Sequence, residues 1–211
     1  MLGAWARIHL NSKTLEVGCG TGIISLMIAQ SNVSSEILAL DINPNAVILA
    51  TSNFSNSKWN NQLSCLHEDF RKPTEQITRQ KYHHIICNPP FFKNGLLSQS
   101  KVQEYARHGT RIGLDEFIAQ SAGVLYPGGT IQLILPYDRI QELENIVAEN
   151  QLYLSRVTLV KSLSNKDVYR ALVEISNQKS TVQSSNLTMY SSEGNYSQDY
   201  KNLLADYMQI F

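Results

Sequence analysis

Short apolar segments rich in β-branched residues alternate with helical patterns along most of this 211-residue chain, and this alternation limits the folds that it can adopt. Strands that alternate with helices are typical of a mostly parallel sheet covered by helices on both faces. With 43% hydrophobic residues the chain can form one sizeable core, so we expect a single domain over residues 1–211. The seven predicted strands are 14–17, 36–42, 63–68, 83–88, 130–136, 154–160 and 169–176.

The connections between these strands predict four helices and one hairpin. Apolar residues recur at helical spacing in the predicted helices, which cover residues 23–30, 45–55, 114–125 and 137–150. Only residues 162–167 separate the last two strands, which favours a hairpin and therefore an antiparallel end of the sheet.

The C-terminal region contains a polar segment and one further helical pattern. Residues 176–186 are Ser-rich and predict a loose loop. Residues 196–211 predict a helix with Ser197 as its N-cap and with Tyr200 and Leu204 on its apolar face. We expect this face to dock on the core; the alternative is a helix that binds a partner.

Composition excludes several functional classes. Eighteen basic and eighteen acidic residues give a formal net charge of zero, so a polyanion would have to bind to a local patch. Neither a run of about 18 apolar residues nor a signal-peptide pattern is found, which predicts a cytoplasmic protein without a membrane span. Cys19, Cys65 and Cys87 form no C-x-x-C pair, and we interpret them as reduced thiols rather than a disulfide framework or a zinc site.

A glycine-rich turn follows the first predicted strand, in the stretch LEVGCGTGII. Gly18, Gly20 and Gly22 allow a tight turn and let backbone N–H groups approach a ligand at the carboxyl ends of the strands. The dinucleotide fingerprint G-x-G-x-x-G fails because Ile23 follows Gly22, and Glu16 before the first glycine is a second departure.

Acidic residues end the second and third predicted strands. Asp41, followed by Ile42, could accept both hydroxyls of a ribose in charge-assisted hydrogen bonds worth about 1.5–3 kcal/mol each. The alternative is that Asp41 is the N-cap of the next helix. Asp69 could accept from an adenine amino group while Phe70 packs on the adenine ring.

Together these features resemble the class I S-adenosylmethionine-dependent methyltransferases. The resemblance implies a Rossmann-like, seven-stranded, mostly parallel sheet whose last strand is antiparallel. It also implies that S-adenosyl-L-methionine lies across the first three strands. The cofactor-binding residues would be Glu16, Gly18, Gly20, Gly22, Asp41, Ile42, Asp69, Phe70 and Asn88.

The fourth predicted strand ends in the stretch ICNPPFF, where two prolines must turn the chain out of the sheet. Asn88-Pro89-Pro90-Phe91 is similar to the N-P-P-[YF] motif of methyltransferases that act on planar amino groups. The amide oxygen of Asn88 and the carbonyl of Pro89 could accept the two amino hydrogens and aim the lone pair at the reactive methyl. We therefore predict that Asn88, Pro89, Pro90 and Phe91 are catalytic; the alternative is that Asn88 caps a turn and the rings fill the core.

Aromatic and basic residues at and after this motif are candidates for substrate binding. Phe91 can stack on the target base, a contact worth about 1–3 kcal/mol, and Phe92 adjoins it. Lys93, Arg107 and Arg111 precede the next predicted helix and are candidate phosphate contacts. The alternative is that these cations belong to a solvated loop.

The substrate is indicated by a wider resemblance. Residues 2–6, 106–117 and 195–211 resemble the tRNA1(Val) (adenine(37)-N6)-methyltransferase family, which methylates the adenine next to the anticodon. The resemblance implies a tRNA partner, no metal, no membrane, and a monomer or weak dimer. Members of that family carry a further N-terminal segment before the stretch that corresponds to residues 2–6, so this segment is expected to be missing from the single domain.

Other functions fit part of the pattern. The N-P-P-F motif also suits an rRNA guanine-N2 methyltransferase or a protein-glutamine methyltransferase, since both act on planar amino groups. A non-catalytic module that binds the cofactor or RNA is the alternative from another class.

Overall fold

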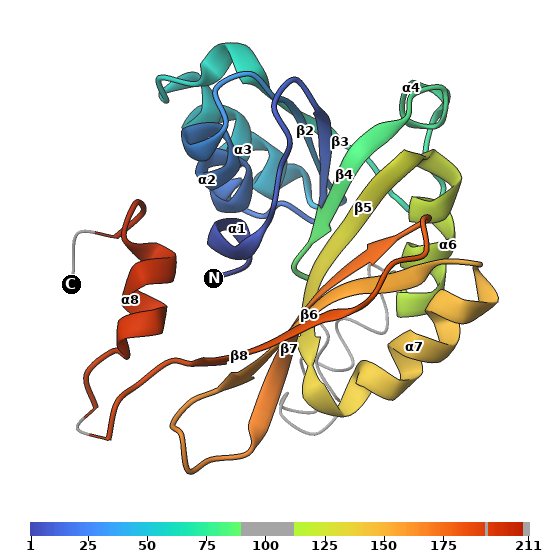
Figure 1. The fold of residues 1–211 in the computed structure, drawn as a ribbon. Helices are drawn as coiled ribbons and strands as arrows, with labels where there is room; N and C mark the ends of the chain where they lie inside the picture. The colour runs from blue at the N-terminus through green and yellow to red at the C-terminus, as the bar shows by residue number, and fades with distance from the viewer. Residues whose placement is uncertain (90–111, 193, 209–211) are drawn as a thin grey trace, which may run out of the picture.

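A computed structural model describes residues 1–89, 112–192 and 194–208, and a mixed sheet forms its centre (Figure 1). Within the described residues the sheet has eight strands in the order β3-β2-β1-β4-β5-β7-β6-β8. The strands are β1 (Lys13–Val17), β2 (Glu36–Asp41), β3 (Leu63–His67), β4 (Tyr82–Cys87), β5 (Leu125–Pro136), β6 (Tyr153–Lys161), β7 (Val168–Ser176) and β8 (Gln183–Thr188).

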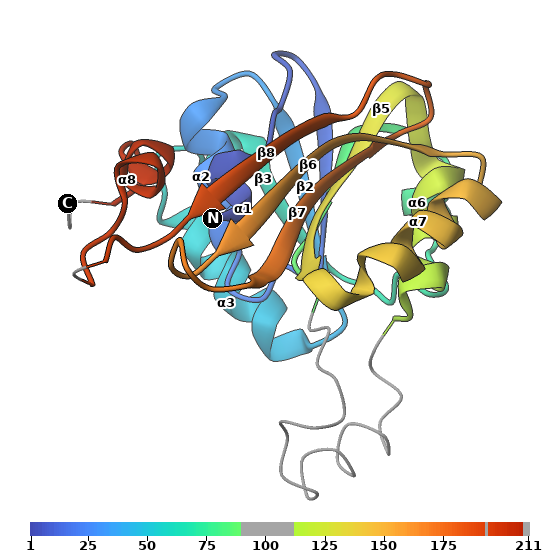
Figure 2. The same cartoon turned by 60° about the horizontal axis from the view of Figure 1, so that its bottom comes forward.

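Helices cover both faces of this sheet. In Figures 1 and 2, α1, α2, α3 and α8 lie on one face, and α6 and α7 lie on the other. The α-helices are α1 (Leu2–Trp5), α2 (Ile23–Ser31), α3 (Pro44–Ser55), α4 (Glu75–Thr78), α6 (Leu114–Val124), α7 (Ile140–Glu149) and α8 (Gln198–Leu204). Two 3₁₀ turns, η1 (Asn60–Gln62) and η2 (Tyr137–Arg139), precede β3 and α7. The predicted helices α2, α3, α6, α7 and α8 are confirmed, whereas the single turns α1 and α4 were not expected.

Successive residues of the central strands pack into two separate apolar cores. In β4, Ile85 and Cys87 pack on the side of α6 and α7, whereas Ile86 packs on the side of α1 to α3. Side chains alternate across a strand, so a sheet that is covered on both faces buries every residue. This is why these strands are continuous apolar runs in the sequence rather than alternating patterns.

The predicted antiparallel hairpin is confirmed, but the sheet ends in a parallel pair, and the predicted loop over residues 176–186 is partly wrong. β7 pairs antiparallel with both β5 and β6, as the short connection requires. An eighth strand, β8, begins at Gln183 and pairs parallel with β6. The four residues of β8 from Gln183 to Asn186 are polar and exposed, so no apolar pattern marks them, and pairing of their backbone with β6 decides their conformation.

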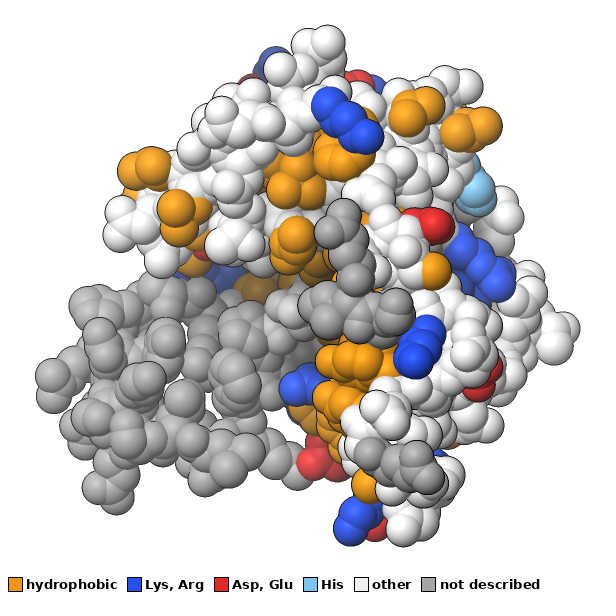
Figure 3. Space-filling view, turned by 90° about the vertical axis from the view of Figure 1, so that its left-hand side faces the viewer, with side chains coloured by type: hydrophobic (Ala, Val, Ile, Leu, Met, Phe, Trp, Pro, Cys, Tyr) orange, Lys and Arg blue, Asp and Glu red, His pale blue; other side chains and the backbone are white. Residues whose placement is uncertain are grey.

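The C-terminal helix docks as expected. The Ser197 side chain accepts a hydrogen bond from the Tyr200 N–H and is the N-cap of α8. Tyr200 and Leu204 are buried, and Ile23 and Met27 of α2 help them to line a groove of about 550 Å³. Figure 3 shows this side of the molecule, with apolar side chains (orange) gathered around the middle of the face.

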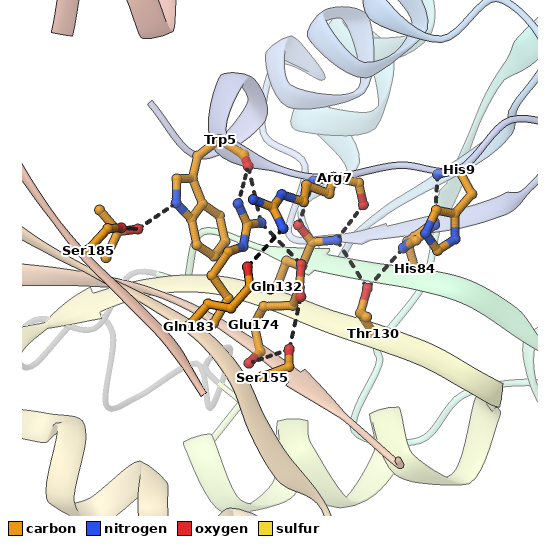
Figure 4. Close-up of polar contacts among 12 residues, drawn as sticks. Trp5, Arg7, His9, His84, Thr130, Gln132, Ser155, Glu174, Gln183 and Ser185 are labelled. Atoms are coloured by element: carbon orange, nitrogen blue, oxygen red, sulfur yellow. Dashed lines mark hydrogen bonds and ion pairs between the residues drawn. The ribbon is translucent and has the colours of Figure 1, made fainter. Parts of the chain in front are cut away.

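A buried ion pair fastens the first residues of the chain to the sheet, and sequence reasoning did not anticipate it (Figure 4). The Arg156 guanidinium lies 3.5 Å from the centre of the Trp5 ring and donates to the Trp5 carbonyl at 3.2 Å. It also pairs with Glu174 at 3.1 Å. The Trp5 indole N–H donates to the Thr158 hydroxyl at 2.9 Å. Burial lowers the pKa of Arg156, with Glu174 opposing that shift.

A second set of hydrogen bonds continues this attachment toward β1. Arg7 exchanges two backbone hydrogen bonds of 3.0 Å with the Gln132 side chain, which also donates to Thr130. The Thr130 hydroxyl contacts His84, whose other ring nitrogen accepts from the His9 N–H. Burial lowers the pKa of His84 to about 3, so this histidine is a neutral part of the core.

We expect Glu174→Gln to lower the free energy of unfolding by about 3 kcal/mol, because it leaves Arg156 buried without its anion. Glu75→Gln is the matched control: Glu75 pairs with Arg79 at a site where both side chains are 76% exposed, against 9% and 12% for Arg156 and Glu174. The control should change stability by about 0.5 kcal/mol at most. Urea unfolding of both variants measures the difference, and equal losses would contradict the importance of the buried pair.

Candidate functional site

The glycine-rich turn joins the carboxyl end of β1 to α2. Gly20 has a φ of 56°, and its N–H donates to the Asp41 carboxylate at 2.9 Å. Gly22 has a φ of 77° and is the N-cap of α2. A Cβ at Gly22 would lie 2.4 Å from the Phe54 ring, so a side chain fits neither the conformation nor the space there.

Asp41 ends β2 beside this turn, because β2 pairs in parallel with β1. Its second oxygen accepts from the Asn43 N–H at 2.8 Å. The N-cap of α3 is Asn43, whose side chain accepts from the Asn45 N–H at 3.0 Å. The alternative interpretation of Asp41 as this N-cap is therefore wrong, and its carboxylate is instead held at the edge of the sheet by two backbone donors.

A cavity of about 480 Å³ opens at this edge, within the usual size range of small-molecule sites. Its lining comes from the carboxyl ends of β1 to β4, from the segment before α6, and from η2. The lining residues are Val17, Gly18, Gly20, Leu40, Asp41, Ile42, Glu68, Asp69, Phe70, Arg71, Cys87, Asn88, Pro89, Ile112, Gly113, Leu114 and Arg139.

Most of the predicted cofactor residues meet at this cavity. Gly18, Gly20, Asp41, Ile42, Asp69, Phe70 and Asn88 line it, whereas Glu16 and Gly22 do not; Pro89, predicted to be catalytic, lines it too. The remaining predicted site residues lie outside the described residues: Pro90, Phe91, Phe92, Lys93, Arg107 and Arg111. Their roles therefore stay predictions.

Glu16 of β1 connects the strand before the glycine turn to the helix after it. Its side chain is 1% exposed and accepts hydrogen bonds from the backbone N–H and the hydroxyl of Ser25, the third residue of α2. The carboxylate thus satisfies a donor that the first turn of a helix leaves without a partner. Burial raises the pKa of Glu16 to about 7 against the hydrogen bonds from Ser25, which lower it.

Asp69 is held by a neighbouring cation. Its carboxylate accepts from the backbone N–H of Arg71 at 3.0 Å and from the Arg71 side chain at 2.6 Å. The Arg71 guanidinium holds the pKa of Asp69 below its usual value, so the carboxylate remains an acceptor. Phe70 is buried, and its ring centre lies 6.1 Å from that of Phe117.

Asn88 and Pro89 follow β4 directly. The parallel pairing of Cys87 with Val17 places Asn88 beside Gly18. The Asn88 side chain is exposed and has no hydrogen-bond partner among the described residues, so its amide is available to a ligand. The alternative interpretation of Asn88 as a turn cap therefore receives no support from the described residues.

Two cations at the cavity were missed in the sequence. Arg71 follows the end of β3, and Arg139 follows the end of β5 in η2. The Arg139 Nε donates to Glu142 at 2.8 Å. Both cations follow the carboxyl end of a predicted strand, which is the signal that had identified Asp41 and Asn88.

The three cysteines are free. Cys19 lies in the glycine turn, with its sulfur 3.8 Å from that of Cys65 in β3. Over residues 1–89, 112–192 and 194–208, no group of three or more His, Cys, Asp or Glu side chains is placed to hold a metal ion. In the same part of the chain, no helix is both long enough and apolar enough to cross a membrane.

Comparison with known proteins identifies the family. The model of the methyltransferase small domain matches residues 6–169. Two curated relatives, from Aliivibrio salmonicida and Aliivibrio fischeri, are 34% and 36% identical over 203 residues, or 96% of this chain and 85% of each relative. Both are named tRNA1(Val) (adenine(37)-N6)-methyltransferase. The chain belongs to this methyltransferase family.

Solved structures support the fold of this methyltransferase. A predicted O-methyltransferase from Agrobacterium tumefaciens superposes with a TM-score of 0.75 at 15% identity. The superposition covers 97% of this chain and 94% of the Agrobacterium chain. The Rossmann-like class I architecture expected from the sequence is therefore confirmed, with eight strands in the described residues instead of seven.

The raised pKa of Glu16 predicts a pH-dependent stability. Because its pKa is about 7 in the folded methyltransferase and about 4.5 otherwise, the unfolded chain releases this proton first, and folded stability falls as pH rises through that window. Glu16→Gln cannot ionise. We therefore expect the free energy of unfolding of wild type, relative to Glu16→Gln, to fall by about 3 kcal/mol between about pH 4.5 and 8. Urea unfolding across this range tests it, and a constant difference would contradict it.

Proposed function

We propose that this methyltransferase transfers a methyl group from S-adenosyl-L-methionine to N6 of adenine 37, next to the anticodon of tRNA1(Val), in the cytoplasm. The names and the identity of the curated relatives support the substrate. The observation that carries the chemistry is the exposed amide of Asn88 at the cavity, beside the glycine turn.

The residues at the cavity suit the proposed cofactor. A carboxylate has about four lone-pair sites, and the two backbone donors on Asp41 occupy two of them, which leaves acceptors for both ribose hydroxyls. Asp69, kept ionised by Arg71, is a second acceptor, suited to the adenine amino group. Ile42, Phe70 and Leu114 supply apolar wall for the ring.

The proposed reaction depends on orientation of the amine. When bound, S-adenosyl-L-methionine supplies an electrophilic methyl group. The lone pair of an exocyclic adenine amine is delocalised into the ring, so the amine becomes nucleophilic only as its nitrogen becomes tetrahedral. The Asn88 oxygen and the Pro89 carbonyl would accept its two hydrogens in that geometry, and no strong base is then required. Phe91 would stack on the extruded base and lower the cost of unstacking it.

We expect Asp41→Ala to weaken binding of S-adenosyl-L-methionine by about 1.5–3 kcal/mol, the scale of a lost charge-assisted hydrogen bond. Asp41→Asn keeps one oxygen acceptor and should show a smaller loss. Glu144→Ala, which removes an exposed carboxylate on α7, is the control and should bind as wild type. Titration calorimetry measures all three variants, and wild-type affinity of Asp41→Ala would contradict the proposed cofactor contact.

Asn88→Ala should instead act on the chemical step. Its contact with the amine matters mainly in the transition state, so the single-turnover rate should fall by about 100-fold or more while cofactor affinity stays near wild type. Rapid-quench methyl transfer to undermodified tRNA measures the rate. A variant that transfers methyl at the wild-type rate would refute the role of Asn88.

The product decides the substrate class. Undermodified tRNA incubated with the chain and labelled S-adenosyl-L-methionine should yield N6-methyladenosine on nucleoside mass analysis. N2-methylguanosine from rRNA, or methylglutamine in protein, would identify one of the competing methyltransferases. Cofactor binding without any methylated product would favour a non-catalytic module.

A further inference from the structure

The β6–β7 hairpin makes its turn at the sheet edge that holds the cavity. Pro136, at the carboxyl end of β5, pairs with Arg170 of β7, and Arg139 three residues later lines the cavity. Lys161 at the end of β6 pairs with Val168 on one side and Thr188 of β8 on the other. The turn of this hairpin and the residues after β8 therefore lie along the same edge of the sheet as the cavity, farther from its opening. We call Lys161, Lys166, Tyr169 and Arg170, together with Tyr190, the hairpin edge.

The hairpin edge carries more positive than negative charge. Residues 161–170 contain three cations, Lys161, Lys166 and Arg170, against one carboxylate, Asp167. Among the described residues none of these three cations forms an ion pair. Since the whole chain has a net charge of zero, this surplus is local.

Three cations at the opposite edge of the sheet have partners. Lys13, at the amino end of β1, pairs with Glu36 at 3.5 Å. Before β4, Arg79 pairs with Glu75, and the Lys81 ammonium donates to the Gly123 carbonyl at 2.5 Å. At the edge beside the cavity, by contrast, three cations that form no ion pair with a described residue lie within ten residues of one another.

Aromatic rings accompany these cations. Tyr169 is 40% exposed, its hydroxyl contacts the Met189 sulfur, and the Arg170 guanidinium lies 5.8 Å from its ring centre. The Tyr190 ring stacks on Tyr196 at 5.1 Å, and Tyr196 stacks on Tyr200 of α8 at 5.2 Å. Cations beside exposed rings are the combination that binds single-stranded nucleic acid, through phosphates and stacked bases.

We propose that the hairpin edge binds the RNA substrate beyond the methylated base, with phosphates on Lys161, Lys166 and Arg170 and unpaired bases against Tyr169 and Tyr190. This inference rests on the proposed function, because it takes the cavity as the place where the target adenine enters. The hairpin edge then holds the RNA outside the cavity, while Asn88 and Asp41 act inside it.

The test combines Lys161→Gln, Lys166→Gln and Arg170→Gln in one variant and measures binding of fluorescently labelled tRNA at several salt concentrations. Three lost phosphate contacts should reduce the slope of log affinity against log salt by about 2 and raise the Kd about 10-fold at moderate salt. The matched control combines Lys13→Gln, Arg79→Gln and Lys81→Gln, which changes the net charge equally at the opposite edge. It should bind tRNA nearly as wild type.

Equal losses in the two triple variants, or wild-type binding by the hairpin-edge variant, would overturn the proposal.

A second experiment tests the stacking role of Tyr169. Tyr169→Ala should raise the KM for tRNA several-fold at unchanged kcat, whereas Tyr169→Phe, which keeps the ring, should have the wild-type KM. Wild-type KM in Tyr169→Ala would remove the stacking role. Failure of this proposal can be told apart from failure of the proposed function. If wild type forms N6-methyladenosine and the hairpin-edge variant binds tRNA as tightly as wild type, only the role of the hairpin edge is refuted. Wild type that binds no tRNA refutes both.

Discussion

Parallel pairing of β1 with β2 on one side and β4 on the other is the constraint on which the site depends. Because the three strands run in the same direction, their carboxyl ends meet at one edge, and the residues that follow them must leave the sheet there. Asp41 and Asn88 come from segments 47 residues apart, yet both reach the cavity through this pairing. The hydrogen bond from Gly20 to Asp41 then connects the turn after β1 to the end of β2.

Buried polar groups maintain this arrangement at two places. Glu16 of β1 accepts a hydrogen bond from Ser25 and so connects the strand before the glycine turn to the start of α2. Arg156 and Glu174 fasten the segment of Trp5 to β6 and β7. Each of these groups is costly to bury alone, and its hydrogen-bonded partners offset that cost. The compensation is incomplete for Arg156, whose Nε has no hydrogen-bond partner among the described residues.

Sequence reasoning succeeded where a local pattern has a single structural solution. The apolar runs identified seven strands, and the short connection before Val168 implied the antiparallel hairpin. Reasoning from strand ends placed Asp41 and Asn88 at one site. It failed for β8, whose polar residues resemble a loop. Glu16 was assigned to the cofactor through the family resemblance, and the structure places its side chain in buried hydrogen bonds with Ser25. Asn43, rather than Asp41, is the N-cap of α3, a distinction of two residues that depends on backbone geometry.

By itself, the sequence determined the class of fold, the glycine turn, the residues at the strand ends and the family, because strand and helix periodicity and short motifs are local properties of the chain. Tertiary structure alone decided which side of the glycine turn Glu16 faces, that Arg156 pairs with Glu174, and that β8 adds to the edge of β6. It also decided that Lys161 and Arg170 lie at the edge that holds the cavity, where neither forms an ion pair with another described residue. These outcomes depend on contacts between segments far apart in the chain. Such contacts form, and stabilise the fold, only after the strands have paired, so no local pattern in the sequence indicates them.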